Sequence, residues 1–231
     1  MLGPGAPGWI AGVAYIVALW LVLSIALHRA EIRSFRPADH VTLARAVLTG
    51  GVVALVADRA TSGAAFVALV SVALALDSVD GLVARRTGTA SPFGARFDME
   101  VDAFLILVLS VQVAMSLGMA LGWWTLTIGL MRYAFVAAAR PMPWLRAPLP
   151  PSMARKTVAA AQGILLGVAG FGPVPHLVAI TLAALALASL CWSFGRDIRW
   201  LWLRRPSSAI VPLGQSRGGH DDFGGTVRSA A

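Results

Sequence analysis

The strongest constraint on this chain is a series of long segments that contain no Asp, Glu, Lys or Arg. Four such segments lie at residues 8–27, 60–76, 103–131 and 158–194. Each is, or contains, a stretch of roughly the 20 apolar residues that a helix needs to cross a bilayer. Only 13% of all residues are charged, against about a quarter in soluble domains. The sequence therefore predicts an all-α fold, a polytopic transmembrane helical bundle.

The apolar segments and the polar residues between them divide into seven predicted transmembrane helices. These lie near residues 8–27, 41–58, 62–85, 95–119, 121–140, 155–172 and 175–200. The first is interpreted as a retained helix, because no basic residue precedes it and no small-residue cleavage site follows it. We expect a surface helix at 28–40, loops at 85–96 and 140–156, and a disordered cytoplasmic tail at 206–231, which is rich in Gly and Ser.

The net charge of +8 does not indicate nucleic-acid binding, because of where the basic residues fall. If the amino terminus lies outside, the segments on the inner side carry nearly all the Arg and Lys, and only Arg59 lies outside. This asymmetry is the positive-inside rule. It predicts a multi-pass protein of the cell membrane whose basic residues also attract anionic lipids.

Four aspartates interrupt this apolar pattern: Asp77, Asp80, Asp98 and Asp102. Helical spacing of three and of four residues puts each pair on one face, and the predicted topology brings both pairs to the cytoplasmic side. Carboxylates placed so close repel one another unless a cation compensates them. Oxygen ligands of this kind select hard ions such as Mg²⁺ or Mn²⁺, and two such ions would balance four charges.

Other interpretations of the aspartates remain open on this evidence. A single intramembrane Asp is more often a helix-packing or ion-pair residue than a catalyst, and two could form the ion site of an ion-coupled transporter. Four at these spacings, joined by a Gly-containing loop, are harder to assign to either class. A structural protein without activity is the third alternative.

The pattern Asp77-x-x-Asp80-Gly81-x-x-Ala84-Arg85, eight further residues, and then Gly94-x-x-x-Asp98-x-x-x-Asp102 resembles the signature of the CDP-alcohol phosphotransferases. Every fixed position and both gaps agree. The resemblance covers roughly residues 28–205 and implies a membrane domain with a core of six transmembrane helices. Residues 1–27 would then form an additional amino-terminal part.

The resemblance also implies roles for individual residues. Asp77, Asp80, Asp98 and Asp102 would hold two metal ions, and Asp102 would be the general base. A second set would bind the CDP-alcohol: Thr42, Arg45, Gly81, Ala84, Arg85, Ser91 and Gly94. The Thr42-x-x-Arg45 element departs from the family pattern at Asp39, where an Asn is usual.

The implied reaction belongs to phospholipid biosynthesis. An acceptor hydroxyl attacks the β-phosphorus of a CDP-linked alcohol, a CDP-diacylglycerol-type lipid, and CMP is released. The active site would face the cytoplasm. Members of the family commonly form homodimers.

The acceptor is predicted from a set of basic residues: Arg132, Arg140, Arg155 and Lys156. They favour a phosphorylated acceptor, with glycerol 3-phosphate as the first choice and inositol phosphate as the second. The sequences around them are similar to those of phosphatidylglycerophosphate synthases. Two departures are Tyr133, where those enzymes have an acid, and Ala103, where they have a lysine.

Overall fold

The computed structural model describes residues 5–29, 36–87, 91–147, 149–150 and 152–204; it does not describe the side chains of residues 38, 78 and 80–87. These residues form helices and no strands, which confirms the predicted all-α class. The elements are α1 (Ala6–Arg29), α2 (Pro37–Ala57), α3 (Ala64–Thr87), α4 (Pro92–Ser116), α5 (Met119–Gly122), η1 (Trp123–Thr125), α6 (Leu126–Ala138), η2 (Pro143–Arg146), α7 (Met153–Ala169) and α8 (His176–Leu203).

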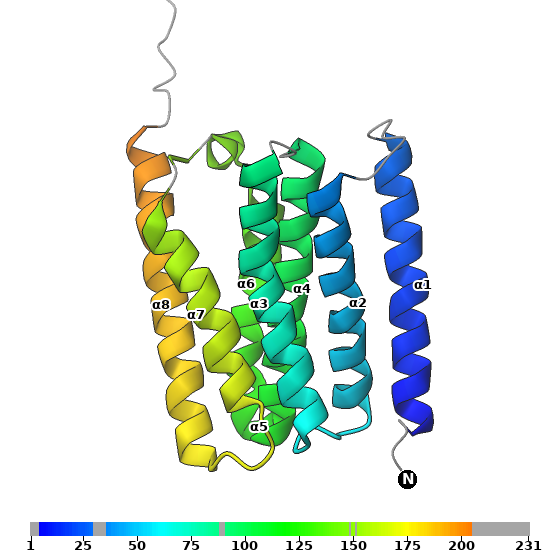
Figure 1. Cartoon of the computed structure of the whole chain (residues 1–231). Helices are drawn as coiled ribbons and strands as arrows, with labels where there is room; N and C mark the ends of the chain where they lie inside the picture. The colour runs from blue at the N-terminus through cyan, green and yellow to red at the C-terminus, as the bar shows by residue number, and fades with distance from the viewer. Residues whose placement is uncertain (1–4, 30–35, 88–90, 148, 151, 205–231) are drawn as a thin grey trace, which may run out of the picture.

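The helices stand side by side in one bundle, with α1 at one edge and α8 at the opposite edge (Figure 1). Four described helices are long and apolar enough to cross a membrane: Ala6–Arg29, Asp39–Ala57, Pro92–Ser116 and His176–Leu203. In α3 the apolar part is shorter, Ala64–Asp77. Each of the seven predicted transmembrane segments corresponds to a helical segment of the bundle.

The boundaries of several elements differ from the prediction. Helix α3 continues to Thr87 and α4 already begins at Pro92, so the connection is shorter than the predicted loop 85–96. Proline suits the first position of a helix, and the Ser91 hydroxyl accepts a hydrogen bond from Gly94 N at 2.8 Å, which caps α4. The ends of the predicted surface helix 28–40 belong to α1 and α2; residues 30–35 and the tail 206–231 lie outside the described residues.

The predicted helix 121–140 is divided into α5, η1 and α6. Gly118 has a φ of +79°, a backbone conformation that favours glycine. A Cβ on Gly122 would lie 2.7 Å from the backbone of Ala114 in α4. The Thr125 hydroxyl donates to Gly122 O at 2.8 Å. The chain therefore turns at this point, close against α4.

The core lies between α2, α3, α4, α7 and α8, and Val52, Phe66, Leu109, Leu166 and Ala183 are among its fully buried side chains. Several polar side chains inside the bundle form hydrogen bonds to other segments of the chain. Gln112 of α4, for example, donates to Thr61 Oγ1 at 2.8 Å and to Gly170 O at 2.9 Å. Because a buried polar group without a partner is costly, these bonds fix how α4 lies against the ends of α2 and α7.

Helix α1 is attached to the bundle through contacts of its amino-terminal half, although most of its apolar side chains are exposed. At its start the Asp58 carboxylate accepts hydrogen bonds from Gly5 N and Gly8 N, both at 2.6 Å. A carboxylate is favourable at a helix amino terminus. Further along, the Tyr15 hydroxyl donates to Ala46 O at 2.9 Å, and the Tyr15 ring stacks on Phe104 of α4 with centroids 5.3 Å apart.

Candidate active site

Arg45 of α2 lies at the centre of the acidic residues. Its side chain is completely buried. Nη1 donates to Asp77 of α3 and, at 2.7 Å, to Asp102 of α4, while Nη2 donates to Asp98 of α4. One guanidinium therefore connects three helices through charge-assisted hydrogen bonds, which are stronger than bonds between neutral groups.

Asp77, Asp98 and Asp102 come together as the sequence predicts. One carboxylate oxygen from each lies within 4.8 Å of the other two. The three side chains keep between 33 and 41% of their surface exposed, so an ion or a substrate can reach them. Several carboxylate oxygens at this separation suit a hard divalent cation, and the donor set therefore fits Mg²⁺ or Mn²⁺.

The predicted residues at the end of α3 lie on the same part of the bundle. Asp80, Gly81, Ala84 and Arg85 continue the helix beyond Asp77 toward Thr87. Their side chains lie outside the described residues, so the structure tests neither the fourth metal ligand nor these nucleotide contacts.

Thr42, Ser91 and Gly94 lie around the start of α2 and α4. Thr42 is buried in α2, as is Asp39, whose Oδ2 accepts from Arg36 N at 3.0 Å. A Cβ on Gly94 would collide with the Asp39 carboxylate. Gly94 therefore allows α2 and α4 to approach closely, which places Arg45 beside the aspartates.

A cavity of about 340 Å³ opens beside Asp77 and Asp102. Most of its lining is apolar, but Arg132 of α6 and Gln162 of α7 also face it. Arg132 Nη2 pairs with Glu100. Arg132 Nε and Gln162 Oε1 are buried and have no hydrogen-bond partner among the described residues. A buried polar group usually has a partner, so these atoms are suited to bind a polar ligand.

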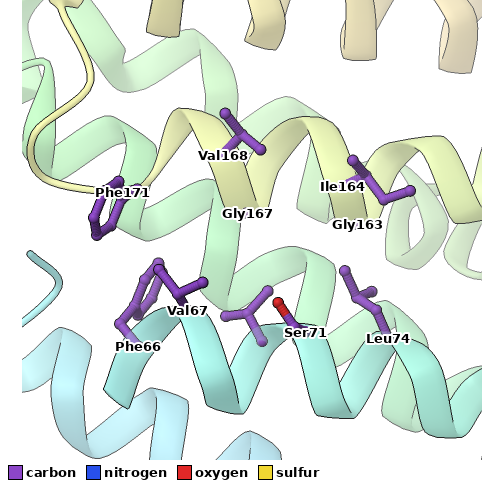
Figure 2. Close-up of a pocket in the computed structure, with 10 residues that line it drawn as sticks. Phe66, Val67, Ser71, Leu74, Gly163, Ile164, Gly167, Val168 and Phe171 are labelled. Carbon is purple, nitrogen blue, oxygen red and sulfur yellow. The ribbon is translucent and has the colours of Figure 1, made fainter. Parts of the chain in front are cut away.

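An apolar groove of about 330 Å³ runs between α3 and α7. Phe66, Val67 and Leu74 point into it from α3, and Ile164 and Phe171 from the side of α7 (Figure 2). Gly163 and Gly167 leave room on α7. Leu74 and Ile164 line both the groove and the cavity beside the aspartates, so the two spaces adjoin.

Comparison with known proteins gives the family. The model of the CDP-alcohol phosphatidyltransferases matches residues 35–192, more than half of the chain. The chain belongs to the CDP-alcohol phosphatidyltransferase family. A search of curated proteins and a search of solved structures found no match.

Membership in the CDP-alcohol phosphatidyltransferase family identifies the chain as a transferase of phospholipid synthesis and, with its apolar helices, as a membrane protein. It also connects the aspartate cluster with the divalent metal that the family uses. Helix α1 precedes the matched region.

The four predicted acceptor residues differ in their surroundings. Arg132 alone among them lines the described cavity. Arg155 pairs with Asp197 of α8 at 3.4 Å and donates to Pro150 O. Arg140 and Lys156 are exposed. The roles of Arg140, Arg155 and Lys156 in binding the acceptor stay predictions, whereas Arg132 lies in the wall of the cavity beside Asp102.

Two residues have a place at this site that the sequence does not predict: Arg45 as the partner of the aspartates, and Gln162 as a polar residue in the cavity. Arg45 was assigned to the nucleotide and not to the compensation of the aspartates. Gln162 is not among the predicted site residues, because it stands further from Lys156 and Thr157 than the glutamine that usually follows this element in the similar synthases. An arginine within two and a half turns of the start of a transmembrane helix could have indicated a buried ionic partner.

We expect Arg45→Gln to lower the unfolding temperature of the purified protein in a chelating buffer, with a loss of about 1–3 kcal/mol, because three carboxylates lose their shared cation. Added MgCl₂ should raise the unfolding temperature of this variant more than that of the wild type, since the ion then compensates the same groups. Arg199→Gln, an exposed arginine of α8, is the matched control. Equal stability of both variants without Mg²⁺ would contradict the role given to Arg45.

Proposed function

We propose that this protein transfers a phosphatidyl group from CDP-diacylglycerol to glycerol 3-phosphate, with release of CMP. The observation that carries the proposal is the cavity that joins Asp77 and Asp102 to Arg132 and adjoins an apolar groove. The aspartates with their metal ions suit the diphosphate of the donor, the apolar groove suits its lipid part, and Arg132 suits the phosphate of a phosphorylated alcohol. The site then faces the cytoplasm, where the distribution of basic residues would put this end of the bundle.

The proposed step is a single displacement at phosphorus. The acceptor hydroxyl oxygen forms a bond to the β-phosphorus, the bond between this phosphorus and the bridging oxygen breaks, and CMP leaves with that oxygen. Asp102 takes the hydroxyl proton as general base. Asp77, Asp80, Asp98 and Asp102 would hold the divalent ions, which supply compensation of the phosphate charges.

Arg45 and the residues at the end of α3 would hold the donor. The Arg45 guanidinium already binds carboxylate oxygens, and its planar set of donors is equally suited to phosphate oxygens. Thr42, Gly81, Ala84, Arg85, Ser91 and Gly94 remain predicted contacts of the CDP moiety. The groove between α3 and α7 would receive an acyl chain, since its described lining is apolar apart from Ser71.

Arg132 would recognise the phosphate of the acceptor. Its side chain is 30% exposed and lines the cavity, and its Nε has no hydrogen-bond partner among the described residues. A charged donor inside a membrane protein favours an anion over a neutral alcohol. Gln162 would accept a hydrogen bond from an acceptor hydroxyl through its unpartnered Oε1.

The reaction is tested by incubating the purified protein with CDP-diacylglycerol, Mg²⁺ and glycerol 3-phosphate, and by measuring CMP. We expect CMP release that depends on the acceptor, and a loss of about a thousandfold or more in Asp102→Asn, because the amide cannot take the proton. Asp58→Asn, at the opposite end of α2, should keep turnover. An ion-coupled transporter would release no CMP. A faster reaction with inositol phosphate would contradict glycerol 3-phosphate as the acceptor.

Substitution of Arg132 tests the acceptor site separately. We expect Arg132→Ala to raise the KM for glycerol 3-phosphate about tenfold or more, as for the loss of a hydrogen bond to a charged group, while the KM for CDP-diacylglycerol changes little. Arg199→Ala serves as the control at an exposed basic residue of α8 that does not line the cavity. An unchanged acceptor KM in Arg132→Ala would exclude this residue from phosphate recognition.

The groove is tested with donors of different chain length. A Cβ on Gly167 would lie 3.0 Å from Val70, so we expect Gly167→Leu to fill the groove and exclude an acyl chain. The kcat/KM for a dioleoyl donor should fall about fivefold or more relative to that for a dihexanoyl donor, because fewer CH₂ groups can be buried. Gly195→Leu is the control, since a Cβ there meets no atom within 4 Å. Equal losses with both donors would contradict acyl-chain binding in the groove.

A further inference from the structure

A third space, a pocket of about 850 Å³, lies between the carboxy-terminal half of α1 and the first turns of α4. Its apolar wall includes Leu19, Val22 and Leu23 of α1. Phe93 and Phe97 of α4, whose rings stack with centroids 6.2 Å apart, form the facing wall. We call this space the α1–α4 pocket.

The α1–α4 pocket is strongly basic at one end. Arg29 ends α1, Arg36 directly precedes α2, and Arg96 lies in the second turn of α4; all three line the pocket and are exposed. Glu100 is the one described carboxylate that lines this pocket. It is ion-paired with Arg132, which lines the cavity beside the aspartates. Three arginines against one already paired carboxylate favour an anionic ligand.

The α1–α4 pocket lies on a different face of α4 from the aspartates, and among the described residues only Ser91, at the start of α4, is both a lining residue of this pocket and a predicted contact of the CDP moiety. At about 100° per residue, Gly94 and Asp102 lie within about 40° of Asp98 around α4, whereas Phe93 and Glu100 lie more than 100° away from it. The lining residues of the α1–α4 pocket and of the cavity beside the aspartates do not overlap. The α1 wall also precedes the region that the family model matches.

We propose that the α1–α4 pocket binds one anionic phospholipid, with its phosphate against Arg29, Arg36 and Arg96 and an acyl chain along α1. Helix α1 has the length and the mean hydropathy of a membrane-crossing helix. Lipid acyl chains would therefore surround α1, and one of them could lie against the apolar wall of the pocket. The arginines stand where α1 ends, at the level of a lipid headgroup. A free phosphate would leave the apolar wall exposed, and a zwitterionic lipid would bring a second cation to the arginines.

The test is native mass spectrometry of the full chain in a neutral detergent, titrated with phosphatidylglycerol or with phosphatidylcholine of identical acyl chains. We expect one phosphatidylglycerol to bind about tenfold more tightly than phosphatidylcholine. Arg96→Gln and, separately, Arg29→Gln should each weaken phosphatidylglycerol binding about fivefold, the effect of one basic residue at an anionic lipid surface. Arg199→Gln removes a charge from α8, at the opposite edge of the bundle (Figure 1), and should change affinity less than twofold.

Four results would overturn the proposal. One is equal affinity for phosphatidylglycerol and phosphatidylcholine. Another is a loss of phosphatidylglycerol affinity in Arg199→Gln as large as that in Arg96→Gln and Arg29→Gln. The third is displacement of the lipid by inorganic phosphate at comparable concentration, which would make the pocket a site for small anions. A change from dimer to monomer in Arg96→Gln, with lipid binding unaltered, would assign the pocket to a second copy of the chain. CMP release by Arg96→Gln at the wild-type rate shows that the variant is folded.

Discussion

The burial of the Arg45 guanidinium among three carboxylates is the interaction on which the arrangement of this site depends. Asp77, Asp98 and Asp102 belong to two helices, and without a cation they would repel one another at this separation. Arg45 contacts all three from a third helix, and its own burial is possible only because they compensate its charge. The close approach of α2 and α4 at Gly94 and Asp39 and the hydrogen bond from Tyr15 to Ala46 fix the helix that carries it.

The position of this cluster in the bundle accounts for the kind of substrate that the site would take. The charged residues lie six to ten residues inside the ends of α2, α3 and α4, about 9–15 Å along the helices. On one side they face a cavity with Arg132 and Gln162, and through it they adjoin an apolar groove. The carboxylates therefore lie beside a cavity that contains a few polar groups and next to an apolar groove, which is the arrangement that the proposed transfer from a membrane lipid to a water-soluble acceptor would need.

Much of this could be predicted from the sequence, because hydrophobic segments and helical spacing are local properties. The helices and the meeting of Asp77 with Asp98 and Asp102 follow from them. The pairing of these aspartates with Arg45 could not be predicted in this way, because Arg45 is more than thirty residues away in the sequence and its contacts depend on how α2 packs. The pairing of Arg155 with Asp197 is likewise long-range, and the division of α5, η1 and α6 follows from the packing of Gly122 on Ala114.

The central claim is that these carboxylates form a site for a divalent cation, and calorimetric titration of the purified protein with Mn²⁺ tests it most directly. We expect saturable binding to the wild type and to Asp58→Asn, and an affinity at least about tenfold lower in Asp98→Asn, which removes a ligand charge. Binding of Mn²⁺ to Asp98→Asn as tight as to the wild type, or no binding to the wild type, would contradict it.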